Sequence, residues 1–282
     1  MSEELLTVRQ ALKLASDLLN NGSSRLEARI LLSFVMSCDQ VYLAAHDDII
    51  LTAGQKDQFL ELTGRRAKNE PIAYIINKKE FYGRDFYADR RVLIPRPETE
   101  HLIDRALTML SRIKAPAILD LCCGSGCIGI TLAAEKPDSA VYFSDISEDA
   151  LEVAEMNFRI LLNKEAEFIC SDLFDNINVR GFDLIAANPP YISEDEMSVL
   201  DDDLSYEPAL ALHGGRTGTD FYTKIIKNAH AFLKPGAALV LEIGFSQAAE
   251  ITALMENCGF SDIRTDKDYS GNDRIISGTA KN

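Results

Sequence analysis

One stretch decides the fold: residues 118–129 read Ile-Leu-Asp-Leu-Cys-Cys-Gly-Ser-Gly-Cys-Ile-Gly. The apolar residues 117–121 before the glycines predict a buried strand, and the apolar residues 127–134 predict a helix. A glycine turn between a strand and a helix lets a ligand approach the backbone, and the helix N-terminus adds free N–H groups. The stretch therefore predicts an α/β fold with a ligand site where this strand ends.

Strand and helix patterns alternate through the rest of the chain after Pro116. Such alternation predicts a mostly parallel, Rossmann-like sheet with helices on both faces. The last two strands have no long helix between them, which predicts an antiparallel edge. Further strands are expected at residues 140–144, 167–170, 182–187, 237–243, 260–265 and 274–279, and further helices at 147–162, 220–233 and 246–257.

The chain before the alternating region has a different residue pattern and divides into two parts. Residues 1–70 carry capping-box patterns at Thr7, Ser24 and Thr52, each before an apolar-periodic run, which predicts a small helical bundle. Residues 71–96 predict a β-hairpin linker, with strand-like runs rich in β-branched and aromatic residues at 72–76 and 81–93 and turn signals at 77–79 and 83–85. Residues 97–282 form the expected main domain, opened by a proline-initiated helix to about residue 113.

Composition excludes several classes of protein. The 282 residues are 46% hydrophobic and 26% charged, which is typical of a globular protein and excludes disorder, collagen and coiled coils. The net charge of −15 repels phosphate backbones, so nucleic acid is not an expected partner. Residues 1–19 lack the features of a signal peptide and no apolar run is long enough to span a membrane, so a cytoplasmic protein is expected.

The six cysteines are spaced irregularly, which favours reduced thiols over a disulfide framework. Three of them, Cys122, Cys123 and Cys127, lie at the glycine turn. They lack the spacing of a zinc site and have no histidine nearby, so no metal is expected.

The glycine turn can be read in two registers. In one, Gly124, Gly126 and Gly129 match the dinucleotide pattern G-x-G-x-x-G, and Asp145 ends the next strand 19 residues after Gly126. A carboxylate at that place can bind both ribose hydroxyls of an adenosine ligand. This register favours an NAD-dependent enzyme, with a ligand-free structural turn as the alternative.

The other register begins at Asp120. The pattern Asp120-x-Cys122-x-Gly124-x-Gly126 resembles the first motif of class I S-adenosylmethionine methyltransferases, with cysteine in place of the first glycine. That substitution leaves open how strict the backbone requirement at residue 122 is.

A tetrapeptide follows the apolar strand at 182–187 and consists of Asn188, Pro189, Pro190 and Tyr191. Ligands of such sheets bind beyond the carboxyl ends of the strands, where these residues fall. The Asn188 side-chain oxygen and a prolyl carbonyl can each accept one N–H of a planar nitrogen, and Tyr191 can pack on a flat group. The structural alternative is a proline-rich loop with a capping asparagine.

The tetrapeptide resembles the motif of methyltransferases that act on planar nitrogens, a set that includes N6-adenine and glutamine N5 enzymes. Over essentially its whole length, the chain resembles the release-factor glutamine methyltransferase family (PrmC/HemK). The family's pattern has a glycine at residue 77, where this chain has Asn77, a residue that tolerates the left-handed conformation; it also differs at Thr219 and Asp220. The matching segments are residues 70–75, 80–83, 93–100, 118–121, 125–128, 171–174, 188–191, 207–208, 211–215 and 271–274.

This resemblance implies a class I methyltransferase fold with a seven-stranded sheet. A monomer is a separate expectation, because the sequence does not give the oligomeric state. It implies methyl transfer from S-adenosylmethionine to N5 of the glutamine in the Gly-Gly-Gln motif of peptide chain release factors. It places the substrate glutamine at Asn188, Pro189, Pro190 and Tyr191, with Asn188, Pro189 and Tyr191 catalytic. The residues it assigns to the cofactor are Asp120, Cys122, Cys123, Gly124, Ser125, Gly126, Asp145, Asp172, Leu173 and Asn188.

Other functions remain as alternatives. An N6-adenine methyltransferase shares the tetrapeptide, but the acidic net charge counts against it. The sister enzyme that methylates a ribosomal protein usually differs at residues 95–100. An NAD oxidoreductase would need a hydride-transfer acid that the sequence does not supply, and a non-catalytic adaptor would not need an amide clamp.

Although the net charge of the chain is negative, one segment is basic. Residues 65–96 contain nine basic and four acidic residues, a net of +5. One hypothesis is that this segment docks the partner protein, and the other is that it is a solvated hairpin face. The aromatic residues interleaved with the charges are Tyr74, Phe81, Tyr82, Phe86 and Tyr87.

Overall fold

The structure is a computed structural model that describes residues 5–199 and 202–281. It divides into two units, Met1–Lys78 and Lys79–Asn282, whose boundary lies inside the expected linker at 71–96. Each unit is built around its own hydrophobic core.

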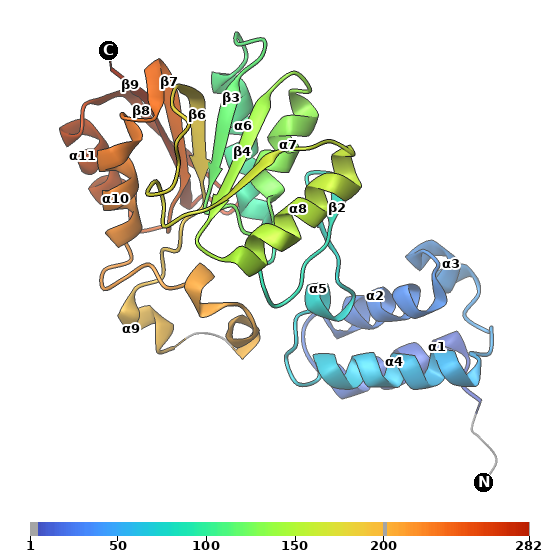
Figure 1. The fold of residues 1–282 in the computed structure, drawn as a ribbon. Coiled ribbons are helices and arrows are strands. Elements are labelled where there is room, and N and C mark those ends of the chain that lie inside the picture. The colour runs from blue at the N-terminus through green and yellow to red at the C-terminus, as the bar shows by residue number, and fades with distance from the viewer. Residues whose placement is uncertain (1–4, 200–201, 282) are drawn as a thin grey trace. The chain divides into compact units, whose positions relative to one another are not determined.

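The first unit is helical, as predicted (Figure 1). Leu31, Leu32 and Phe59 are fully buried in its core. The capping boxes at Thr7 and Thr52 are confirmed, whereas α2 begins at Ser24 itself and its N-cap residue makes no side-chain capping bond. The helices are α1 (Val8–Leu19), α2 (Ser24–Met36), α3 (Gln40–Ala45), α4 (Ala53–Arg66) and α5 (Ile72–Ile75).

The strand expected at residues 72–76 is wrong, because this segment forms the helical turn α5. Pro71 precedes it with φ fixed at −59°, a value suited to the start of a helix, and Ile75 is buried in the helical core. A short apolar run does not by itself distinguish a strand from a buried helical turn. Asn77 adopts the left-handed conformation with φ of 51°, as expected of an asparagine at a glycine position.

The hairpin is shorter than predicted and belongs to the second unit. It pairs β1 (Lys79–Phe81) with β2 (Arg84–Phe86). Tyr82 and Gly83 connect the strands with φ of 50° and 72°, and two positive φ angles in a row define the turn type that suits a tight hairpin.

A seven-stranded sheet forms the centre of the second unit, which confirms the predicted α/β class I architecture (Figure 1). The strand order is β5-β4-β3-β6-β7-β9-β8, with the first five parallel and β9 antiparallel to both of its neighbours. The strands are β3 (Ala117–Leu121), β4 (Ala140–Asp145), β5 (Glu167–Cys170), β6 (Phe182–Ala187), β7 (Leu233–Glu242), β8 (Phe260–Lys267) and β9 (Asp273–Ala280).

Helices cover both faces of this sheet. Alternate strand residues separate into two cores, so Ile118 packs with α6, α7 and α8 while its neighbour Leu119 packs with α10 and α11. The helices of at least nine residues are α6 (Glu100–Met109), α7 (Cys127–Glu135), α8 (Glu148–Leu162), α10 (Asp220–Ala229) and α11 (Ala248–Asn257). The short ones are η1 (Pro97–Thr99), α9 (Glu194–Met197), η2 (Asp202–Tyr206) and η3 (Ala209–Ala211).

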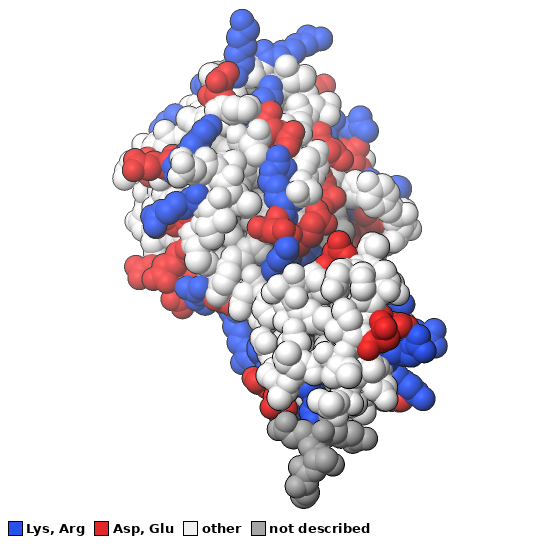
Figure 2. Space-filling view, turned by 90° about the vertical axis from the view of Figure 1, so that its right-hand side faces the viewer, with Lys and Arg blue, Asp and Glu red and all other residues white. Residues whose placement is uncertain are grey.

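The aromatic residues of the basic segment do not form an exposed face. Tyr74 is buried in the first unit, and Phe81 and Phe86 are buried in the second. The expectation of an aromatic docking surface is wrong for these three residues because they build the cores. On the face shown in Figure 2, basic side chains lie among acidic ones. No helix in the described part of the chain is both long and apolar enough to cross a membrane.

Candidate active site

The glycine turn after β3 is formed by residues in the left-handed region. Gly124 and Gly126 have φ of 52° and 76°, and Cys122 has φ of 60°. The conformation that the first glycine of the methyltransferase motif permits is therefore retained here by a cysteine. A non-glycine residue held in this region costs about 1–2 kcal/mol.

Gly129 allows α7 to start close against the sheet. A Cβ atom at this position would lie 2.4 Å from Cε1 of Phe143 and 2.9 Å from Cβ of Asp120. The Gly129 N–H donates to Oδ2 of Asp120 at 2.7 Å. Asp120 is fully buried, and burial, with Asp145 nearby, raises its pKa well above the usual range. In this structure Asp120 supports the start of the helix and does not line the cavity described below.

Asp145, the last residue of β4, is oriented by two backbone N–H groups. Its Oδ2 accepts from Gly124 at 2.9 Å and its Oδ1 accepts from Ser147 at 3.0 Å. Burial raises the pKa of this carboxyl, while the backbone hydrogen bonds act to lower it. The side chain is thus fixed beside the glycine turn, at the end of the neighbouring strand.

The segment after β5 continues the same edge of the sheet. Ser171 donates its N–H to the Asp145 carbonyl at 2.9 Å, which sets the position of the next two residues. Asp172 is exposed, and Leu173 is buried with φ of 50°. A branched residue in the left-handed region marks backbone strain, which concentrates at ligand sites.

The loop of residues 188–191 after β6 is braced from other segments. Gln247 donates from Nε2 to the Tyr191 carbonyl at 3.1 Å. Gly214 approaches so closely that a Cβ there would lie 2.7 Å from Cα of Tyr191. Its N–H donates to the Ile192 carbonyl at 2.7 Å. Contacts from residues 214 and 247 to the backbone at Tyr191 and Ile192 therefore fix the loop.

The side chain of Asn188 has one partner within the described chain. Its Nδ2 donates to Oγ1 of Thr99 at 3.4 Å. Thr99 in turn donates to Oε2 of Glu242 at 2.5 Å, and both residues are buried. Burial raises the pKa of Glu242 from 4.5 to about 7, with the Thr99 hydrogen bond opposing the rise.

One cavity brings most of the predicted site residues together. Those among its lining are Cys122, Cys123, Gly124, Ser125, Asp145, Asp172, Leu173, Asn188 and Pro190. Asp120, Gly126, Pro189 and Tyr191 lie outside this lining, and Pro189 is buried. Burial raises the pKa of Tyr191 to about 12, so its hydroxyl stays neutral.

Sequence reasoning missed a second wall of the cavity. It assigned no role to Thr99, which lines the cavity, although residues 93–100 were matched as a motif. It also did not single out Glu242, which lies outside the lining and accepts from Thr99. A usable signal existed for Glu242, because this acidic residue ends the apolar run of residues 237–241. The further lining residues include Arg91, Leu93, Arg96, Thr99, Leu210, Phe221 and Lys224.

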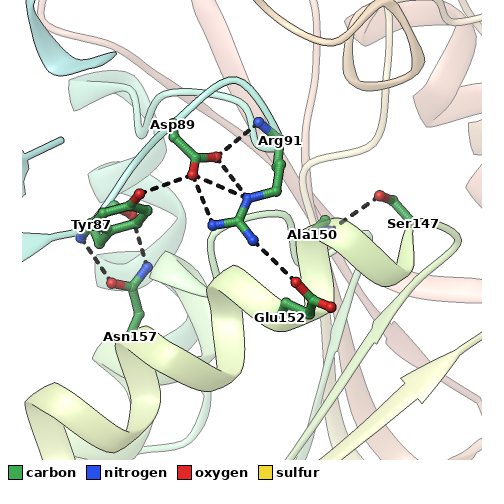
Figure 3. A network of polar contacts seen from close by, with 7 residues as sticks. All are labelled: Tyr87, Asp89, Arg91, Ser147, Ala150, Glu152 and Asn157. Atoms are coloured by element: carbon green, nitrogen blue, oxygen red, sulfur yellow. Dashed lines mark hydrogen bonds and ion pairs between the residues drawn. The ribbon is translucent and has the colours of Figure 1, made fainter. Parts of the chain in front are cut away.

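A buried asparagine on α8, Asn157, contacts both Tyr87, as Figure 3 shows, and the glycine turn. Asn157 accepts from the Tyr87 N–H at 2.8 Å, and its Nδ2 donates to the carbonyls of Tyr87 and Ser125 at 3.0 Å each. Arg91, which lines the cavity, reaches Glu152 of the same helix at 3.1 Å. One helix therefore fixes both the glycine turn and the segment that faces it.

The residues present fit an adenosine-containing ligand better than a metal. The oriented Asp145 carboxylate is an acceptor of the kind that could hold ribose hydroxyls, and Leu173 adds an apolar wall to the same cavity. Burial raises the pKa of the thiols of Cys122 and Cys123 well above their usual range and that of Cys127 to about 12, so these thiols stay protonated. Among residues 5–199 and 202–281, no group of three or more His, Cys, Asp or Glu side chains is placed to hold a metal ion.

Comparisons with known proteins agree with this geometry. Residues 10–76 match a family model described as the PrmC N-terminal domain, and residues 101–202 match the methyltransferase small domain. A methyltransferase structure from Pyrococcus furiosus is similar with a TM-score of 0.54 at 18% identity, covering 79% of this chain and 99% of that one. That likeness shows the fold alone.

Two curated relatives are more similar in sequence. A release factor glutamine methyltransferase of Clostridium acetobutylicum is 39% identical over 254 residues, which is 89% of either chain. One of Koribacter versatilis is 39% identical over 258 residues, which is 91% of either chain. The chain therefore belongs to the release factor glutamine methyltransferase family.

Proposed function

We propose that the protein transfers a methyl group from S-adenosylmethionine to N5 of the glutamine in the Gly-Gly-Gln motif of peptide chain release factors. The observation that carries the proposal is that Asn188 lines one cavity together with Asp145 and the glycine turn. A residue that can bind the substrate amide and residues that can bind a nucleoside thus line the same cavity. We further propose that the protein acts as a monomer in the cytoplasm, where its substrate works.

The cofactor side of the cavity consists of the glycine turn, Asp145, Asp172 and Leu173. The Asp145 carboxylate holds the ribose hydroxyls, and Asp172 and Leu173 flank the adenine. S-adenosylmethionine supplies a methyl group that is already activated on a sulfonium. The protein therefore needs to supply placement and electrostatic support, with little acid–base chemistry.

The substrate side must hold a poor nucleophile. The lone pair of an amide nitrogen is conjugated with its carbonyl group, so the nitrogen gains reactivity only when its N–H bonds are polarised and its orientation is fixed. Asn188 offers its side-chain oxygen to one N–H, and the carbonyl of Pro189 is the acceptor for the other. Two prolines in sequence stiffen this loop, and Tyr191 packs beside it. A proton lost after transfer passes to water.

The proposal is tested by a competition assay with methyl-labelled S-adenosylmethionine. A release factor, the same factor with its Gly-Gly-Gln glutamine replaced by alanine, a ribosomal protein and DNA are offered side by side. We expect label on the intact release factor alone. Label on DNA or on the ribosomal protein, with none on the release factor, would overturn the proposal and favour one of the two alternative substrates.

A further inference from the structure

Two buried side chains lie behind Asn188. Thr99, at the end of η1, is 2% exposed, and Glu242, at the end of β7, is 1% exposed. Ala187 pairs with Leu241 in the sheet, so Asn188 and Glu242 are the next residues at the same edge. Thr99 reaches both of them, at 3.4 Å and 2.5 Å respectively.

The directions of these hydrogen bonds determine how the Asn188 amide lies. A hydroxyl group carries a single hydrogen, and Thr99 donates it to the Glu242 carboxylate. Toward Asn188 the hydroxyl oxygen can then only accept. The amide must therefore present its NH₂ group to Thr99, which turns Oδ1 away from it.

We propose that Thr99 and Glu242 are positioning residues that fix the Asn188 amide with its oxygen available to the N–H of the substrate. The inference rests on the proposed function, because it assigns an acceptor role to Oδ1 of Asn188. Reversal of the amide would present two N–H donors to a substrate that has only N–H groups to offer at this point. Neither Thr99 nor Glu242 is required to touch the reacting atoms.

A purely structural role does not account for Glu242. Its carboxylate forms no ion pair with any described residue, and Thr99 is its side-chain donor. Arg274 and Arg96 favour its charged form from a distance, but a buried carboxyl without an ion-pair partner still destabilises the fold, whereas an apolar side chain at the end of β7 would not. A role in positioning Asn188 would explain why a destabilising buried carboxylate is present at residue 242.

The arrangement has a pH-dependent consequence. Protonated Glu242 can donate to Thr99, whose hydrogen then turns toward Asn188 and favours the reversed amide. Since the pKa of Glu242 is about 7, turnover should fall as pH drops below neutrality. The charged and titratable groups around it are Arg96, Glu98, Cys127, Tyr191, Tyr222 and Arg274.

Three variants test the inference, each assayed by steady-state kinetics at saturating S-adenosylmethionine. Thr99→Val removes the hydroxyl at similar volume, Thr99→Ser keeps it, and Glu242→Gln keeps an acceptor that cannot titrate. We expect Thr99→Val to lower kcat about 10- to 100-fold with little change in KM for the substrate, and Thr99→Ser to restore most of it. The acidic limb of the pH profile should be present in Thr99→Ser and absent from both Thr99→Val and Glu242→Gln.

Thermal denaturation of each variant shows whether it is folded. Equal kcat in Thr99→Val and wild type, or an unchanged acidic limb in Thr99→Val, would overturn the inference. The measurements use whichever planar-nitrogen substrate the wild type methylates in the competition assay. A failure of the release-factor proposal therefore stays distinguishable from a failure of the positioning role.

Discussion

The glycine turn and the loop of residues 188–191 line the same cavity, but they are held in place by different means. The turn owes its shape mainly to left-handed residues and to hydrogen bonds that link it to Asp120, Asp145 and Asn157 of the neighbouring strands and helix. The loop is held through Thr99, Gly214 and Gln247, which lie on segments outside this part of the sheet. Because the two sides have separate supports, we expect substitutions on one side to leave the other side largely unchanged.

The largest expected effect separates the two sides directly. Asn188→Ala removes the amide acceptor and leaves the glycine turn intact, so we expect kcat to fall by at least about 10³-fold. The affinity for S-adenosylmethionine, measured by calorimetry, should change by no more than a few fold.

Asp145→Ala is the matched variant on the turn side. It should weaken binding of S-adenosylmethionine by at least about tenfold, because a half-buried, oriented acceptor for two hydroxyls is lost. Equal weakening of cofactor binding by Asn188→Ala and Asp145→Ala would contradict the assignment of cofactor binding to the turn side and substrate binding to the loop side.

A second prediction concerns the buried carboxyl behind the loop. The pKa of Glu242 is raised from 4.5 to about 7, so the folded state binds more protons than the unfolded state between these values. The stability that this group contributes is present below pH 4.5 and is lost as pH rises through 7. Relative to Glu242→Gln, the wild type should lose about 3 kcal/mol of unfolding free energy between pH 4 and pH 8. Urea denaturation across that range measures it, and parallel pH curves would contradict it.

A third comparison concerns two glycines whose backbones pack closely against other residues, Gly129 on the turn side and Gly214 on the loop side. Gly129→Ala places a Cβ against Phe143 and Asp120, and should lower the unfolding free energy by about 1–3 kcal/mol. Gly214→Ala places a Cβ against the backbone of Tyr191, so it should lower kcat by a larger factor than Gly129→Ala does. Gly54→Ala in α4 is the control, because nothing lies within 4 Å of its added Cβ. Equal kcat losses in the first two variants would show that the loop is not separately braced.

The smallest effect is expected at residue 122. Cys122→Gly relieves the left-handed strain of about 1–2 kcal/mol, and the greater freedom of glycine in the unfolded chain offsets part of that gain. Thermal denaturation should show a net stabilisation of about 0.5–1 kcal/mol with unchanged cofactor affinity. A loss of stability would mean that the packing of the thiol outweighs the strain.

The sequence was sufficient for the parts of the site that are local. The turn, Asp145 and the tetrapeptide each stand at the end of an apolar strand, and parallel strands place their carboxyl ends at one edge. Thr99 and Glu242 could not be paired in this way, since 143 residues separate them and it is the packing of α6, which follows η1, against β7 that brings this part of the chain to Glu242. The segment at 72–76 was mistaken for a strand because its apolar run is too short to show a period.

The central claim is that the side-chain nitrogen of the glutamine in a Gly-Gly-Gln motif receives the methyl group. The most direct measurement is mass spectrometry of a release factor after incubation with the protein and S-adenosylmethionine, with fragmentation to locate the modified residue. The account predicts one added methyl group, on the side-chain nitrogen of that glutamine and absent with Asn188→Ala. An unmodified Gly-Gly-Gln peptide, recovered beside methylated DNA or ribosomal protein in the same mixture, would contradict it.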